Sequence, residues 1–204
     1  MQPAMLTGLI LAGGQARRMQ SQGMSAGHID KGLLDWHGQP LVAHARHALA
    51  PHVQTVLISA NRHAQQYAAY GHVMADDASL GMDLGPLAGV ERALALAQTP
   101  WLMVLPVDVV NLPPGLVTQL LAAVNAQTAP VAYACTAERV HPLCMVLHVR
   151  LAASLRDYLM AGGRKVLLWQ EQHQAVPVLF RGDDLFFNIN TPQDLAYASQ
   201  CWKS

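Results

Sequence analysis

Short apolar runs alternate with longer segments of helical period along almost the whole chain, and this alternation restricts the possible folds more than any other feature. It predicts stacked βα units around a largely parallel sheet. The expected strands are residues 6–11, 55–59, 73–75, 101–106, 130–135, 143–148 and 175–180. The expected helices are residues 40–49, 63–70, 86–98, 114–125, 151–161, 166–172 and 192–200. We therefore predict an α/β protein with a three-layer architecture and a mostly parallel sheet.

The length and charge of the chain exclude several classes of protein. Its 204 residues suit one well-buried α/β domain better than two independent cores. The 13 Lys and Arg residues balance 13 Asp and Glu residues, so no net basic field favours nucleic acid or an anionic membrane. No stretch approaches the ~20 apolar residues of a membrane span, and residues 1–5 lack the basic start of a signal sequence. We expect a single cytoplasmic domain, residues 1–204, that binds neither nucleic acid nor membrane.

Cysteines and histidines do not predict a metal centre. The three cysteines have neither CxxC spacing nor an even count, which argues against disulfides and a cysteine-based zinc site. His44 and His47 share a helical face, but no third ligand accompanies them, so solvated helix positions are the better interpretation. His141 precedes Pro142 at a strand entry, where it either lines a binding pocket or is an extended turn residue.

A glycine pair directly follows the first predicted strand. Gly13 and Gly14 allow a tight turn and expose backbone N–H groups that can hold phosphate, and Arg18 and Lys31 can supply cationic donors to a triphosphate. An ordinary turn with solvated cations is the alternative. The pattern is neither a Rossmann GxGxxG nor a Walker loop. Residues 20–30 have no apolar period and are predicted to form a loop at the ligand-binding edge of the sheet.

Carboxylates also follow predicted strands. Asp108 comes directly after the run 101–106, where a carboxylate is placed to hold Mg²⁺ that bridges nucleotide phosphates. Asp76 and Asp77 follow another short strand and are expected at the same edge of the sheet. Asp108 could instead cap a helix or form a turn, and Asp77 could equally belong to a turn. The shared edge favours a functional role for at least one pair.

A wider set of motifs occurs in order along nearly the whole chain. It comprises Leu11-Ala12-Gly13-Gly14, Arg18-Met19, Asp30-Lys31-Gly32-Leu33-Leu34, Gly38-Gln39-Pro40-Leu41, Asn61-Arg62-His63, Gly85-Pro86-Leu87-Ala88-Gly89, Pro106-Val107-Asp108, His141-Pro142 and Asn188-Ile189-Asn190-Thr191-Pro192. With these motifs the chain resembles the molybdenum cofactor guanylyltransferase family. The glycine turn with a downstream lysine is also similar to sugar-nucleotide pyrophosphorylases, whereas the Gly-Pro-Leu-Ala-Gly and Asn-x-Asn-Thr-Pro motifs are more specific.

The resemblance implies a role for each matching position. The implied catalytic residues are Arg18, Lys31 and Asp108, with Asp108 also holding Mg²⁺. The implied nucleotide-binding residues are Leu11, Ala12, Gly13, Gly14, Lys31, Ser59, Asp76 and Asp108, with Asp77 as the alternative to Asp76. The implied acceptor-binding residues are His141, Asn188 and Asn190. Three features depart from the family: Ser59 stands where relatives often have Asn, residues 20–29 lengthen the phosphate loop, and Val107 replaces the cysteine of the familiar Pro-Cys-Asp motif.

The implied reaction is attack of a pterin-bound phosphate on the α-phosphorus of GTP, with pyrophosphate leaving. The resemblance also implies a fold of the nucleotide-diphospho-sugar transferase type, with a Rossmann-like nucleotide-binding half at 1–110 and an acceptor-binding half at 111–204. GTP, the molybdopterin cofactor, and transiently the proteins that deliver the cofactor and the apo-molybdoenzymes are the implied partners. A cytidylyltransferase, a sugar-nucleotide pyrophosphorylase and a non-catalytic GTP-binding module stay open as alternatives.

Overall fold

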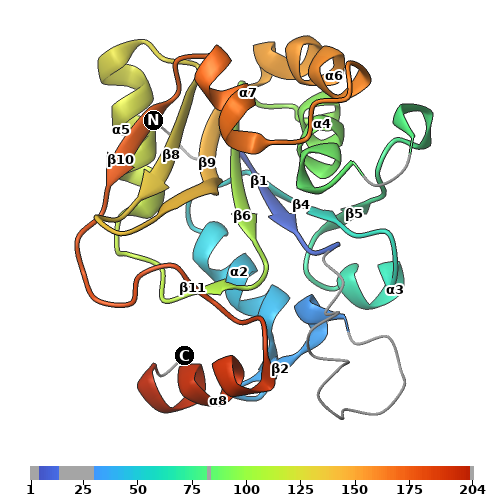
Figure 1. Cartoon of the computed structure of the whole chain (residues 1–204). Helices are drawn as coiled ribbons and strands as arrows, with labels where there is room; N and C mark the ends of the chain where they lie inside the picture. Colours follow the sequence, from blue (N-terminus) through green and yellow to red (C-terminus); the bar gives the residue numbers. More distant parts are fainter. Residues whose placement is uncertain (1–4, 14–29, 82–83, 203–204) are drawn as a thin grey trace.

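The computed structural model describes residues 5–13, 30–81 and 84–202 (Figure 1). Its centre is a seven-stranded sheet in the order β10-β8-β9-β6-β1-β4-β5. The strands are β1 (Leu6–Leu11), β4 (Thr55–Ser59), β5 (His72–Met74), β6 (Trp101–Pro106), β8 (Val131–Cys135), β9 (Val140–His148) and β10 (Val176–Leu179). All seven match predicted strands, so the alternation of apolar runs located the sheet.

The sheet is mostly parallel, as predicted. β1 pairs in parallel with β4 and β6, β4 with β5, and β8 with β10. β9 is antiparallel to both of its neighbours, β6 and β8. Only a few residues separate β8 from β9, which suits an antiparallel pair because a parallel pair needs a long crossover. β9 begins three residues earlier than predicted because its first residues pair with β8 beyond an irregularity at Tyr133 and Ala134.

Helices cover both faces of the sheet and give the predicted three layers (Figure 1). α2 (Leu41–Leu49) and α5 (Leu116–Gln127) pack on one face, where α8 (Pro192–Cys201) joins the same core. α4 (Pro86–Leu96), α6 (Ala152–Met160) and α7 (Val166–Gln172) pack on the other face. Alternate residues of β6 enter the two cores, Met103 the first and Leu102 the second, because successive strand side chains point to opposite faces.

Several short elements have no counterpart among the predictions. β2 (Asp35–Trp36) and β3 (Gln39–Pro40) form a small hairpin, and β7 (Val109–Val110) pairs antiparallel with β11 (Phe187–Asn188). The 3-10 turns are η2 (Lys31–Leu33), η3 (Ala78–Leu80) and η4 (Val149–Leu151). The helix predicted at residues 63–70 is present as α3 but is shorter, at Ala64–Tyr67. The β7–β11 pair has a functional consequence, since it brings a C-terminal segment beside the chain that leaves β6.

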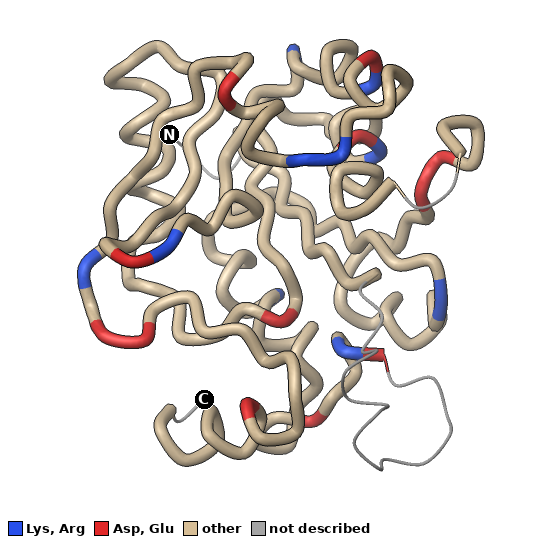
Figure 2. Tube along the Cα trace, in the orientation of Figure 1, with Lys and Arg blue, Asp and Glu red and all other residues tan. Residues whose placement is uncertain are grey.

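Charged residues are dispersed along the described trace, where Lys and Arg do not form one continuous basic band (Figure 2). This distribution agrees with the balanced charge of the sequence. None of the described helices combines the length and the apolar character that a membrane crossing requires.

Candidate functional site

The carboxyl ends of β1, β4 and β6 meet at one edge of the sheet, because these three strands are adjacent and parallel. Backbone hydrogen bonds continue the pairing past the strands: Ala12 N–H donates to Ser59 O at 2.9 Å, and Val107 N–H donates to Leu11 O at 3.1 Å. Leu11, Ala12 and Ser59, all predicted to bind a nucleotide, therefore lie together. The Ala12 N–H is already bonded to Ser59 O and is therefore not available to a ligand.

Gly13 continues this edge and is exposed. Its φ lies outside the left-handed region, and within the described residues an added Cβ would meet only Ser59 O, at 3.9 Å. Neither backbone conformation nor packing against described residues therefore requires glycine here, and no described residue fills the space beside Gly13. Gly14 and Arg18, predicted for the same turn, lie outside the described residues.

Ser59 lies against α4 and is only 6% exposed. A Cβ at Gly89 would come within 2.4 Å of Ser59 Oγ and 3.0 Å of Leu11 Cδ2. The second glycine of the Gly-Pro-Leu-Ala-Gly motif thus lets α4 approach the ends of β1 and β4 closely. The predicted contact between Ser59 and a nucleotide stays a prediction.

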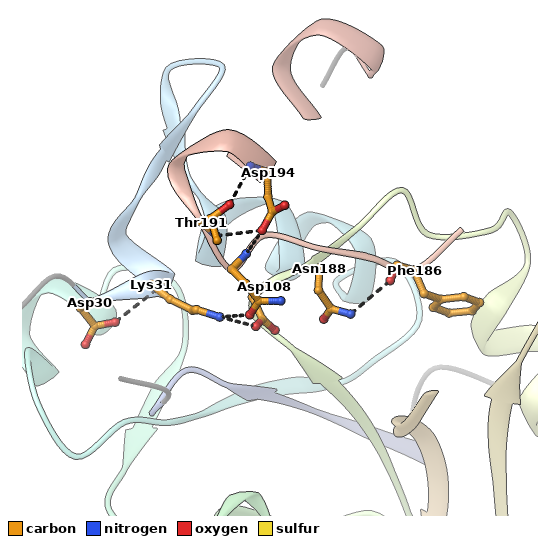
Figure 3. A network of polar contacts seen from close by, with 9 residues as sticks. Asp30, Lys31, Asp108, Phe186, Asn188, Thr191 and Asp194 are labelled. Atoms are coloured by element: carbon orange, nitrogen blue, oxygen red, sulfur yellow. Dashed lines mark hydrogen bonds and ion pairs between the residues drawn. The ribbon is translucent and has the colours of Figure 1, made fainter. Parts of the chain in front are cut away.

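The side chain of Lys31 connects two other residues of the candidate site, Asp108 and Asn190 (Figure 3). Its Nζ donates to Asp108 Oδ2 at 2.9 Å and to Asn190 Oδ1 at 2.5 Å. The side chains of Lys31 and Asp108 are 11% and 22% exposed, so this ion pair is less screened than a surface pair. Three residues that the sequence places 77 or more positions apart thereby converge, and each was assigned to the site from the sequence.

Asp30 fixes the position of Lys31. Its carboxylate caps η2 by accepting from Gly32 N–H at 3.2 Å, and it also accepts from the hydroxyl of the buried Tyr67. Burial, followed by the bond to Asp30, raises the pKa of Tyr67 far above its usual range, so the phenol is a neutral donor. Tyr67 carried no sequence signal, because it lies 37 residues from Asp30 in a short helix.

Asp76 and Asp77 lie beyond β5 at the same edge but have different partners. Asn61 Nδ2 donates to Asp76 Oδ2 at 2.8 Å, and Asp76 N–H donates to Asn61 Oδ1 at 3.0 Å. Asp77 instead caps η3 by accepting from Ser79 N–H at 2.9 Å, and it also accepts from Arg156. Bonds to Ser79, followed by the bond to Arg156, lower the pKa of Asp77 to about 2. The carboxylate of Asp77 is already bonded to Ser79 and Arg156, which favours Asp76 as the candidate nucleotide ligand.

The Asn-x-Asn-Thr-Pro motif crosses the site between β11 and α8. Ile189 N–H donates to Asp108 O at 2.9 Å, and the Ile189 side chain is fully buried, as its alternation with two asparagines predicts. Thr191 and Asp194 form a capping box at the start of α8, and Asp194 Oδ2 also accepts from Asn190 N–H at 2.9 Å. The cap of α8 thus sets the direction in which Asn190 reaches Lys31.

A cavity of about 610 Å³ opens beside this motif. Its lining includes Asn188, Asn190, His141 and Phe186. His141 stacks on Phe186 with ring centroids 4.5 Å apart, and its buried Nε2 has no hydrogen-bond partner among the described residues. Burial, and then the charge of Arg139, lower the pKa of His141, so the ring is neutral at neutral pH. The three residues predicted to bind an acceptor therefore line one cavity next to Lys31.

Comparison with known proteins identifies the family. The model of the MobA-like NTP transferase domain matches residues 8–176. Two curated molybdenum cofactor guanylyltransferases are 41% identical to the chain: one from Shewanella frigidimarina over 91% of each chain, and one from Yersinia pseudotuberculosis over 95% of this chain and 94% of its own. The chain belongs to the molybdenum cofactor guanylyltransferase family. The resemblance seen in the sequence is confirmed, and with it the prediction of a nucleotidyltransferase.

Solved structures agree on the fold. Molybdopterin-guanine dinucleotide biosynthesis protein A from Archaeoglobus fulgidus superposes with a TM-score of 0.74 at 21% identity, over 95% of this chain and 97% of its own. The 2-C-methyl-D-erythritol 4-phosphate cytidylyltransferase from Thermus thermophilus gives a TM-score of 0.68 at 20% identity, over 98% of each chain. Enzymes with different names thus share this architecture, so the predicted nucleotidyltransferase fold is confirmed.

Proposed function

We propose that this chain transfers GMP from GTP to the molybdenum-molybdopterin cofactor, which forms the guanine dinucleotide cofactor and releases pyrophosphate. The observation that carries the proposal is the position of the Lys31 ammonium between Asp108, at the end of β6, and Asn190, beside the cavity. A cation between these two residues can contact a nucleotide phosphate and, at the same time, face an acceptor bound in the cavity. Membership of the family supplies the identity of both substrates.

The side chains that could coordinate a metal at this site suit Mg²⁺ that binds together with a nucleotide. Within the described residues, no group of three or more His, Cys, Asp or Glu side chains is arranged to hold a metal by itself. Mg²⁺ typically binds through one or two carboxylates together with substrate phosphates, and Asp108 offers such a carboxylate. When bound, Mg²⁺ would neutralise phosphate charge and polarise the α-phosphorus. Asp108 would hold it, with no dedicated protein cage.

In this reaction the protein mainly has to align the two substrates and neutralise the charge of the phosphates. Lys31 neutralises phosphate oxygens, while Leu11, Ala12 and Gly13 bind the nucleotide along the sheet edge and Asp76 binds it from the end of β5. Arg18 and Gly14 complete the nucleotide site in this proposal. The acceptor phosphate is largely ionised at neutral pH, since its second pKa is ~6, so no side chain needs to remove a proton.

The acceptor binds in the cavity beside Asn188 and Asn190 in this proposal. An amide offers both a donor and an acceptor, which suits the mixed edge of a pterin. His141 supports the cavity through its stack on Phe186. Residues 1–110 then form the nucleotide-binding half of a single domain and residues 111–204 the acceptor-binding half. A cytoplasmic location, with transient contact to cofactor-delivering proteins and apo-molybdoenzymes, belongs to the same proposal.

Thermal unfolding with each nucleoside triphosphate and Mg²⁺ tests the nucleotide part of the proposal. A ligand that binds only the native state raises the melting temperature, so GTP is expected to stabilise the protein more than CTP, UTP or ATP. Equal stabilisation by CTP would favour a cytidylyltransferase on the same fold. Stabilisation by GTP without pyrophosphate release in the presence of the pterin cofactor would indicate a GTP-binding module.

Gly13→Ala is expected to weaken GTP binding more than CTP binding. The protein accommodates the methyl group, because the nearest described atom lies 3.9 Å from the added Cβ, so the loss arises from crowding of the purine. The ratio of the two dissociation constants, measured by calorimetry, isolates this effect from any change in stability. An equal loss for both nucleotides would show that the turn contacts only phosphate or sugar.

Asn188→Ala is expected to impair binding of the pterin cofactor and to leave GTP binding unchanged. Asn190→Ala is expected to affect both substrates, because its Oδ1 also accepts from Lys31. The measurement is the affinity for each substrate, and Asn125→Ala, at an exposed position near the end of α5, serves as the control. Normal pterin binding by both variants would show that the acceptor binds outside this cavity.

A further inference from the structure

The guanidinium of Arg156 joins three elements beside the candidate nucleotide site. From α6 it donates to Asp77 Oδ2 at 3.1 Å, to Ser79 Oγ at 3.1 Å and to Glu91 Oε1 at 2.8 Å. Asp77 and Ser79 belong to the segment that follows β5, whereas Glu91 belongs to α4. One side chain from residues 111–204 therefore connects two separate parts of residues 1–110.

Glu91 makes this contact stronger than an ordinary surface ion pair. Its side chain is only 5% exposed, and its Oε2 has no hydrogen-bond partner among the described residues. A buried carboxylate is unfavourable without a counter-charge. The positive charge of Arg156 offsets this cost for Glu91, which keeps the guanidinium beside the carboxylate. Nη1 donates to both Glu91 and Asp77, and Nη2 donates to Ser79, so the contact with Glu91 orients the guanidinium toward the segment that holds Asp77 and Ser79.

The segment after β5 is thus held from two sides. Asn61 bonds both the carboxylate and the N–H of Asp76, while Arg156 bonds Asp77 and Ser79, which follow Asp76 by one and three residues. Asp77 keeps its charge because its pKa is lowered to about 2, below its usual value, so its bond to Arg156 is at full strength above pH ~4 and is lost only as the pH falls toward 2.

We propose that Arg156 is a positioning residue of the nucleotide site, which fixes residues 76–80 so that Asp76 faces the bound nucleotide. The inference rests on the proposed function. Arg156 does not touch the nucleotide in this account, but acts on Asp76 through Asp77 and Ser79. Glu91 has the supporting role of holding the guanidinium in place.

The test is the double variant Arg156→Met/Glu91→Gln. The second change removes the buried charge that Arg156→Met alone would leave uncompensated, and so keeps the protein folded. The KM for GTP is expected to rise about tenfold with kcat within about twofold, because Asp76 is displaced while Lys31 and Asp108 are not. Hydrogen exchange of residues 76–81 is expected to accelerate. Arg156→Lys, which retains the charge but cannot reach three acceptors together, is expected to rescue KM only in part.

The matched control is Arg150→Met, since the Arg150 side chain is exposed and forms no ion pair within the described part of the chain. It is expected to leave KM and exchange unchanged. A double variant with wild-type KM and wild-type exchange at residues 76–81 would overturn the inference. Faster exchange with an unchanged KM would also overturn it, because Arg156 would then only stabilise α4 and α6. If the wild-type protein itself failed to bind GTP, the proposed function would be wrong, which is a distinguishable result.

Discussion

Asp108→Asn is expected to reduce GMP transfer by about 10³-fold or more, which corresponds to several kcal/mol of lost transition-state stabilisation. The amide is nearly the same size as the carboxylate but lacks the negative charge that Mg²⁺ prefers. Asp108 also supports the site through its backbone, since Asp108 O accepts from Ile189 N–H, and the substitution keeps this bond. Steady-state rates at saturating GTP, together with Mg²⁺ titration, measure the effect.

The control for this variant is Asp157→Asn, which removes one carboxylate at an exposed position of α6. It is expected to retain wild-type rates. The melting temperature of Asp108→Asn is expected to stay near that of the wild type, because a half-buried pair with Lys31 becomes a hydrogen bond to the amide oxygen. Near-normal transfer by Asp108→Asn would remove this residue from the metal site.

Lys31→Ala is expected to weaken GTP binding and to slow chemistry together, with a loss of about 10²-fold in kcat/KM. In the proposed function, the ammonium contacts phosphate charge both in the bound nucleotide and as charge develops on the leaving pyrophosphate. The truncation also removes the donor that joins Asp108 to Asn190, so pterin binding is expected to weaken as well. Binding of each substrate by calorimetry, followed by single-turnover rates, separates these effects.

Arg150→Ala serves as the control for the lost positive charge in this experiment. It lies in η4, at an exposed position outside the candidate site. Unchanged substrate affinities and rates in Lys31→Ala would contradict the proposed role of Lys31. If Lys31→Ala lowered the melting temperature but left the affinity of the folded protein for both substrates unchanged, Lys31 would have only a structural role as the partner of Asp108.

Most of the sheet was predictable because each long strand carries its own local signal. The runs 6–11 and 101–106 are largely apolar and are followed by Gly13 and Asp108, so both the strands and the ligand-binding edge could be located. Parallel neighbours then bring their carboxyl ends together by topology alone. The convergence of Lys31, Asp108 and Asn190 agrees with roles that the family resemblance assigned to each of them separately.

The remainder could not be predicted because it depends on contacts between distant residues with no periodic signal. β7 and β11 have two residues each, and only their pairing places Asn188 and Asn190 beside Asp108. Tyr67 and Asn61 have no local pattern that links them to Asp30 and Asp76. The bonds of Arg156 to Asp77 and Glu91 span 79 and 65 residues, and Glu91 looks like a solvated helix position until the packing of α4 against α6 is known.

The most direct measurement of the central claim is a transfer reaction with GTP labelled at the α-phosphate, Mg²⁺ and the molybdenum-molybdopterin cofactor. The proposed function predicts that the label appears in the pterin product, that pyrophosphate leaves unlabelled, and that α-labelled CTP gives far less product. Absence of labelled pterin product under conditions where both substrates bind, or equal transfer from CTP, would contradict the assignment of this chain as a guanylyltransferase.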